Sequence, residues 1–143
     1  PPALRALQAD HGAQWADVDG DGDVDLALTG SRTDGMHFIM RNLLPAAEAA
    51  RGLFVRVVDS QGHATRAGAE VRVFAAGSRR LVGARLVDSG SGYDAQNDAP
   101  IHVGVPAGVS TVDVEVTIPQ RGTRRVVTRR GVSPGRSITI KTN

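Results

Sequence analysis

The chain has no cysteine, a single lysine and only five aromatic residues among its 143. The absence of cysteine excludes a disulfide scaffold and any metal site built on thiolates, and it fits either side of a membrane. No apolar run approaches the roughly eighteen residues that span a bilayer. Glycine (17 residues) and valine are abundant instead, which is typical of short strands joined by many turns.

The formal charge of +2 conceals an uneven distribution. Residues 1–25 hold six acidic groups and one basic group, a balance of −5, whereas residues 26–143 hold nine acidic and sixteen basic groups, a balance of +7. No signal peptide is visible, and the chain begins with Pro1 and Pro2 rather than methionine. We therefore expect a mature or excised piece of a longer protein, whose targeting segment, if any, lies upstream.

Residues 17–25 place an aspartate at every second position: Asp17, Asp19, Asp21, Asp23 and Asp25. So many adjacent carboxylates repel one another unless a cation offsets their charge. Ca²⁺ takes six to eight oxygen ligands, and a D-x-D-x-D-G loop supplies them from alternate positions. The pattern predicts side-chain ligands at Asp17, Asp19 and Asp21, a sharp turn at Gly22, a backbone carbonyl from Asp23, and Asp25 closing the shell.

This loop differs from an EF-hand, because position twelve is Leu28 where that motif has a bidentate glutamate. The residues on both sides, 12–16 and 26–29, read as short strands, so we expect a calcium loop between two strands. The alternative interpretation is a polar, glycine-rich turn that binds nothing, since aspartate and glycine both favour turns.

The whole chain reads as all-β. Residues 1–42 contain three strand candidates (12–16, 26–29 and 36–42), which is the size of a partial propeller blade. One blade cannot bury both faces, so we expect further blades upstream. Residues 43–52 read as a linker with one or two helical turns that begin at Pro45.

From residue 53 to 143, apolar and polar residues alternate along several short runs separated by turn clusters. The clearest run is 112–118, Val-Asp-Val-Glu-Val-Thr-Ile, which is typical of a half-buried antiparallel strand. The spacing of these runs predicts a small antiparallel β-sandwich of about seven strands.

Two families resemble the two halves of the chain. Residues 17–28 look like an FG-GAP or VCBS repeat of a calcium-dependent propeller of the integrin α-subunit kind. The later part is similar to the ASPIC/UnbV domain of the cartilage acidic protein 1 family and its bacterial relatives. The segments that carry this second resemblance, which holds from about residue 53 to 140, are 68–73, 88–93, 96–98, 101–105 and 118–119. The chain departs from that family at 45–50, which is alanine-rich, and at 117–120, where the family has Trp-Pro-Ser-Gly.

The resemblance implies a calcium-binding, non-catalytic module of adhesion type, located outside the cytoplasm: extracellular, periplasmic or at the cell surface. It implies a protein or glycan ligand, and the remaining propeller blades as upstream partners. An alternative is an accessory or catalytic protein of bacterial natural-product biosynthesis, for example of enediyne type, with a pocket near residues 89–98.

The segment 88–98 supplies the candidate ligand-binding residues Ser89, Ser91, Tyr93, Gln96 and Asp98. Its serines do not fit the G-x-S-x-G pattern of an activated nucleophile, so we assign no catalytic residue. The alternative is a glycine-rich loop in which Tyr93 packs and the serines bond to the backbone.

An arginine-rich hairpin over residues 121–130 is a possible contact for an anionic polymer. It has no interleaved aromatic residues, which argues against stacking on single-stranded nucleic acid, and we do not expect a nucleic-acid partner. The preferred interpretation is a solvated hairpin whose charges prevent sheet-to-sheet aggregation. Binding to an anionic polymer predicts steep salt dependence instead.

Overall fold

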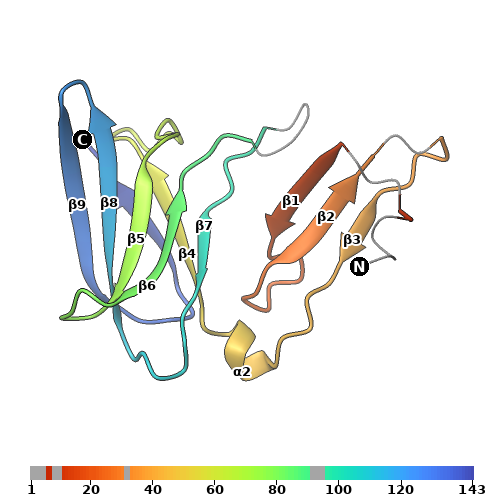
Figure 1. Cartoon of the computed structure of the whole chain (residues 1–143), viewed down its shortest axis with the longest axis horizontal. Helices are drawn as coiled ribbons and strands as arrows, with labels where there is room; N and C mark the ends of the chain where they lie inside the picture. The colour runs from red at the N-terminus through yellow and green to blue at the C-terminus, as the bar shows by residue number, and fades with distance from the viewer. Residues whose placement is uncertain (1–5, 8–10, 31–32, 91–95) are drawn as a thin grey trace.

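The computed structural model describes residues 6–7, 11–30, 33–90 and 96–143. It is built from three small sheets, so the all-β prediction is confirmed. Figure 1 shows a three-stranded sheet near the N-terminus beside a two-sheet sandwich, with the short helix α2 at the connection.

The N-terminal sheet is an antiparallel meander in the order β1-β2-β3. Its strands are β1 (Gly12–Ala16), β2 (Asp25–Thr29) and β3 (Phe38–Met40). The strand β3 is shorter than the predicted 36–42. The Asp34 carboxylate accepts a hydrogen bond from the Met36 N–H at 3.1 Å, so the turn continues into the first predicted strand residue.

The connection to the sandwich contains the predicted helical turn as α2 (Ala46–Ala49). Pro45 precedes this helix rather than beginning it: its φ of −54° suits a helix, but its ψ of 135° is extended. The carbonyl of Pro45 accepts hydrogen bonds from Glu48 and Ala49, which closes the first turn.

The remaining seven strands form two facing sheets, as the alternating pattern predicts. One sheet has the order β10-β4-β7 and the other the order β6-β5-β8-β9. The strand bounds are β4 (Gly52–Val58), β5 (Glu70–Ala75), β6 (Leu81–Leu86), β7 (Ile101–Gly104), β8 (Val112–Gln120), β9 (Thr123–Val132) and β10 (Ser137–Lys141).

One pairing departs from the expected antiparallel arrangement, because β10 runs parallel to β4. After β9 the chain crosses to the opposite sheet, and β10 then lies beside β4 in the same direction. The hairpin between β8 and β9 turns at Arg121 and Gly122, where a φ of 77° at Gly122 favours glycine.

The core lies between these two sheets and is formed mainly by valine. Alternate residues of β4, β5 and β8 point inward, so the polar residues between them, such as Arg72 and Glu115, point outward. The largest of the side chains with exposures below 2% are Leu53, Val55, Val71, Val73, Val112, Val114, Val116 and Thr142. Side chains that contact one another across both sheets make this half a single packed unit.

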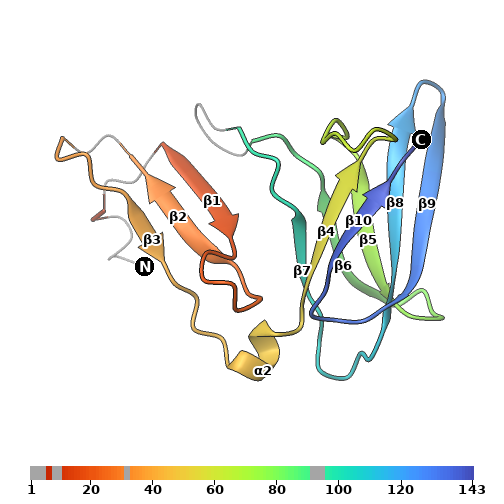
Figure 2. The same cartoon turned by 180° about the vertical axis from the view of Figure 1, so that it is seen from behind.

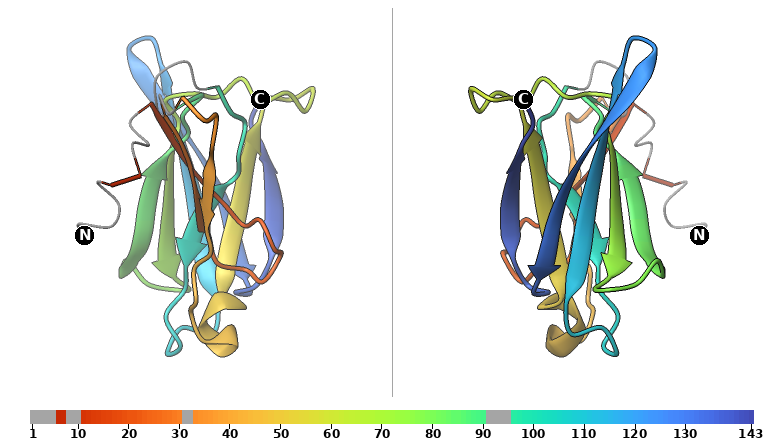
Figure 3. Two further views of the ribbon diagram at one scale, coloured as in Figure 1. Left: turned by 90° about the vertical axis from the view of Figure 1, so that its right-hand side faces the viewer. Right: turned by 90° about the vertical axis from the view of Figure 1, so that its left-hand side faces the viewer.

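The edges of the sandwich lie on opposite sides. The edge strand β6 lies against β7, the edge strand of the other sheet, on the side that faces β1. The other two edge strands, β9 and β10, therefore lie on the far side of the sandwich, which faces the viewer on the right of Figure 3. Within the described ranges, no helix has the length and apolarity that a membrane crossing requires.

Candidate metal centre and adjoining cleft

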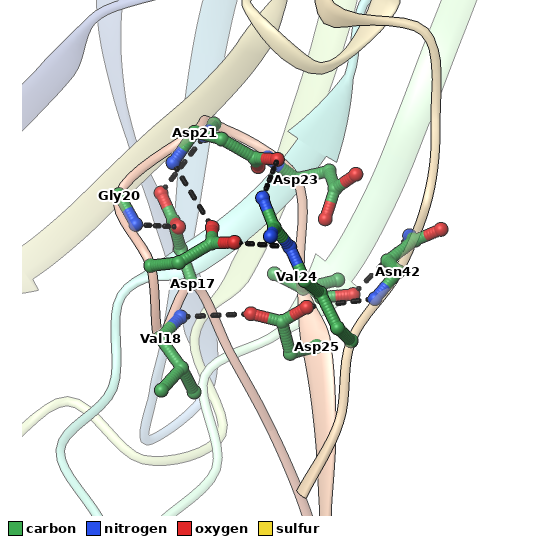
Figure 4. Close-up of polar contacts among 11 residues, drawn as sticks. Asp17, Val18, Gly20, Asp21, Asp23, Val24, Asp25 and Asn42 are labelled. Atoms are coloured by element: carbon green, nitrogen blue, oxygen red, sulfur yellow. Dashed lines mark hydrogen bonds and ion pairs between the residues drawn. The ribbon is translucent and has the colours of Figure 1, made fainter.

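The aspartate run forms a tight loop between β1 and β2. Gly20 and Gly22 have φ values of 77° and 102°, which favour glycine and let the chain curl back on itself. The loop wraps around the Asp17 carboxylate, which accepts hydrogen bonds from the Gly20 N–H at 2.7 Å and the Gly22 N–H at 3.1 Å (Figure 4). Backbone donors thus hold the carboxylates in place.

Three of the predicted ligands converge. One carboxylate oxygen from each of Asp17, Asp19 and Asp21 lies within 4.8 Å of the other two, and solvent reaches the group. All the atoms that could bind a metal ion here are oxygens, the ligand type that hard cations such as Ca²⁺ prefer. The geometry is therefore compatible with a divalent cation held by these three side chains.

Arg41, just after β3, places its guanidinium on this cluster. Its Nε lies 2.5 Å from Asp19 Oδ2, and its Nη2 lies 3.9 Å from Asp21 Oδ2. The arginine supplies positive charge where the sequence pattern predicts a metal ion.

Asp25 closes the base of the loop through backbone hydrogen bonds. Its Oδ2 accepts from the Val18 N–H at 3.0 Å, and its Oδ1 accepts from the Asn42 N–H at 2.8 Å. The N–H groups of Asn42 and Val18 lower the pKa of Asp25, so the carboxylate stays ionised. Each oxygen keeps a second lone pair, and ligation by Asp25 stays a prediction.

Asp23 differs from its neighbours, because its side chain is only 2% exposed and neither carboxylate oxygen forms a hydrogen bond with any residue that the structure describes. Burial raises the pKa of Asp23, and the nearby charges of Asp21 and Asp25 raise it further. The Leu44 N–H is near enough to lower the pKa in part, but it does not complete a hydrogen bond to the carboxylate. A buried carboxylate without a partner is costly, and a nearby cation would reduce that cost. The predicted contact from the Asp23 carbonyl is untested.

The loop is seated on the sandwich through the backbone of Gly22. A Cβ added to Gly52, at the start of β4, would lie 1.9 Å from the Gly22 carbonyl oxygen, so only glycine fits there. His102 Nε2 lies 3.2 Å from the same oxygen. Since a carbonyl can only accept, the contact assigns the ring proton to Nε2. Burial lowers the pKa of His102, which favours the neutral ring.

A cleft of about 780 Å³ lies between β1 and the β6–β7 side of the sandwich. Five consecutive residues from Ala13 to Asp17 line it, so the strand β1 presents its edge rather than one face. Gln14 and Asn97 join across the cleft through a 3.0 Å hydrogen bond. The opposite wall contains aromatic and imidazole rings as well as charged side chains. Its residues are Phe54, Arg85, Leu86, Asp88, Asn97, Ala99, Pro100, Ile101, His102 and Ser137, and the loop adds Val24.

Two of the five predicted ligand residues, Ser89 and Asp98, lie beside this cleft rather than in it. Ser89 and Asp98 line a neighbouring cavity of about 30 Å³. Asp98 also forms an ion pair with Arg56 at 2.7 Å, and Gln96 is exposed. The other two candidates, Ser91 and Tyr93, fall outside the described residues. None of these five assignments has been tested.

Several residues of the site have no local sequence signal. Arg85, Asn97 and His102 come from separate segments that only the tertiary fold brings together. Trp15 had one usable signal: it is the only tryptophan of a chain poor in aromatics, and it stands two residues before the aspartate run. Its 57% exposure is high for so large an apolar side chain.

The fold and the site together define an all-β protein in which an acidic, metal-compatible loop is seated on a two-sheet sandwich beside a polar cleft. Residues 59–143 match the family described as ASPIC and UnbV, and because this is more than half of the chain, the chain belongs to that family. The match confirms the resemblance of the later part and does not extend to the FG-GAP or VCBS repeat. No curated protein and no solved structure matches the chain.

Proposed function

We propose that this chain is a calcium-binding, non-catalytic binding module that acts outside the cytoplasm. The observation that carries the proposal is the convergence of Asp17, Asp19 and Asp21 within 4.8 Å in a loop seated on the sandwich. The buried, unpartnered Asp23 beside them adds a charge that a cation would offset.

In this proposal the metal ion is structural first. Ca²⁺ offsets the repulsion among the loop carboxylates and fixes the turn that carries Gly22 to Gly52 and His102. Because this contact joins the N-terminal sheet to the sandwich, metal binding also stabilises the walls of the cleft. The cleft is the surface we propose for a protein or glycan ligand, since it combines apolar area with a few polar side chains.

The three-stranded sheet is an antiparallel meander with the acidic loop at its first turn, which supports the interpretation as a partial FG-GAP or VCBS blade. Exposed apolar side chains on and beside the sheet, including Ile39 at 66% and Met36 at 50%, are compatible with contacts to neighbouring blades. We therefore propose that the remaining blades of a longer chain are the partners of this surface.

Thermal unfolding with calcium and with excess chelator tests the metal proposal. At a hundredfold excess over Kd, calcium stabilises the folded state by about 2.7 kcal/mol, which raises Tm by roughly 5–10 °C for a chain of this size. The double variant D19N/D21N should lose this shift, whereas D98N, which removes a carboxylate elsewhere, should keep it. An unfolding midpoint that moves with neither calcium nor chelator would contradict the proposal.

A second candidate is an accessory or catalytic protein of bacterial natural-product biosynthesis. The cleft favours it, because Arg85, Asp88 and His102 converge there with both charge and a titratable ring. This candidate predicts that Asp88→Asn abolishes product formation in a producing strain while calcium-dependent unfolding stays normal. Unchanged product formation would support the binding module.

A further inference from the structure

The last part of the chain carries charge of one sign only. After Glu115, the remaining 28 residues contain no acidic side chain, six arginines and Lys141. This excess is local, because the formal charge of the whole chain is only +2.

Most of these basic residues belong to one side of the sandwich. Strands β9 and β10 are the outer strands of the two facing sheets. No residue of β9 lines the cleft, and β10 reaches it only at Ser137. Arg125 Nη1 donates to the Asn143 carbonyl oxygen at 2.6 Å and so joins β9 to the residues that follow β10. We call the residues from Arg121 to Lys141 on these two edges the basic flank.

The arginines of β9 and its turn form no close ion pair with the acidic side chains that the structure describes, although the charge of Arg130 contributes to the lowered pKa of Asp113. Within the described ranges, no ion pair reaches four exposed arginines: Arg121, Arg124, Arg129 and Arg130. Elsewhere on the sandwich the situation differs, because Arg56, Arg72 and Arg79 each lie within 3.0 Å of a carboxylate. The positive charge of the basic flank is therefore available to a partner.

A five-residue repeat distributes this charge over both faces of the edge. Residues 123–127 read Thr-Arg-Arg-Val-Val, and residues 128–132 read Thr-Arg-Arg-Gly-Val. Side chains alternate along a strand, so a repeat of odd length places matching residues on opposite faces. Arg129 lies opposite Val114, which points into the sandwich, whereas Arg124 lies opposite Pro119 on the other face.

We propose that the basic flank binds an extended polyanion, and that this partner is a sulfated or carboxylated polysaccharide. The planar guanidinium group recognises sulfate and carboxylate groups through paired hydrogen bonds. Ten strand residues extend over about 33 Å, and two packed sheets are separated by about 10 Å. This long, narrow strip suits a single linear polymer chain that runs along the edge.

A nucleic acid fits the same surface less well. The last aromatic residue of the chain is Tyr93, so the flank offers no ring on which unpaired bases can stack. A duplex would present only one of its two backbones to a strip as narrow as the edge of a sandwich. Charge and shape together therefore favour the polysaccharide.

The test measures binding of a fluorescent heparin octasaccharide to the full chain by anisotropy, over a series of sodium chloride concentrations. We expect wild-type binding that weakens steeply with salt. The variant R124Q/R129Q should bind more weakly, with the log–log salt slope reduced by about 0.7 for each contact removed. The matched control R72Q/R80Q removes the same charge from β5 and the turn after it, outside both the cleft and the basic flank, and should keep the wild-type slope.

Three outcomes would overturn the proposal: no binding at physiological salt, an equal loss in both double variants, or tighter binding of a DNA duplex of equal charge. The first outcome would leave the charged edge as protection against strand addition. Binding should persist in excess chelator, because no contact in the described part of the chain joins the arginines of β9 to the aspartate loop. A failure of the calcium proposal is therefore distinguishable from a failure of this one.

Discussion

Replacement of Arg41 by glutamine should tighten calcium binding. In the structure the Arg41 guanidinium lies 2.5 Å from Asp19 and 3.9 Å from Asp21, two of the three convergent carboxylates. A cation that enters this cluster must displace the arginine or bind beside its positive charge. Both effects oppose binding, so the direction of the expected change is the same in either case.

The expected change is modest because the arginine is exposed. Two unit charges about 4 Å apart interact by about 1 kcal/mol in water. The Arg41 side chain is 63% exposed, and exposed ion pairs contribute about 0.2–1 kcal/mol after screening. We therefore expect R41Q to lower the calcium Kd by up to about fivefold, with a smaller difference at high salt.

Isothermal titration of wild type and R41Q with calcium, at low and high ionic strength, measures this change. The variant R56Q is the control, since it removes one charge from another exposed ion pair, with Asp98. Equal or weaker calcium binding by R41Q would refute the reasoning. The absence of calcium binding in both proteins would instead refute the metal site itself.

Two further predictions concern the contacts that hold the fold. Gly52→Ala should cost about 1–3 kcal/mol of unfolding free energy, because the new Cβ would lie 1.9 Å from the Gly22 carbonyl oxygen. The control is Gly104→Ala: Gly104 pairs with Gly52 in the register, and an added Cβ meets nothing within 4 Å. This control should cost less in the same thermal unfolding measurement. The pKa of Asp113 is lowered, mainly because its carboxylate accepts a hydrogen bond from the Gly131 N–H. The ionised carboxylate therefore stabilises the fold at pH values above the ordinary pKa of 3.8, and this stabilisation is lost as the pH falls through the lowered pKa of the folded state. Asp113→Asn should lower Tm at neutral pH and flatten the acid limb of the Tm–pH curve; an unchanged acid limb would contradict this.

Much of the local structure could be predicted from the sequence. The aspartate run folds as the predicted turn between strands, because the glycine positions and the alternating carboxylates act within a few residues of one another. The alternation along 112–118 likewise predicted which side chains of β8 are buried, since successive strand residues point to opposite faces.

Contacts between distant segments could not be predicted in this way. The parallel pairing of β10 with β4 joins residues about eighty positions apart, and no local pattern specifies it. The pocket expected near residues 89–98 illustrates the same limit. The larger cleft uses Asn97 from that segment, but its other walls come mainly from β1, the aspartate loop and strands of both sandwich sheets.

The all-β class, the strand faces, the acidic loop and the family resemblance of the later part could all be predicted from the residues, because each depends on spacing along the chain. Three contacts depend on packing instead: the loop rests on Gly52 and His102, Asp23 is buried without a hydrogen-bond partner among the described residues, and Arg41 lies on the carboxylate cluster. These contacts depend on how separate sheets pack, and packing is decided by the shapes of all the surfaces that meet rather than by any one segment.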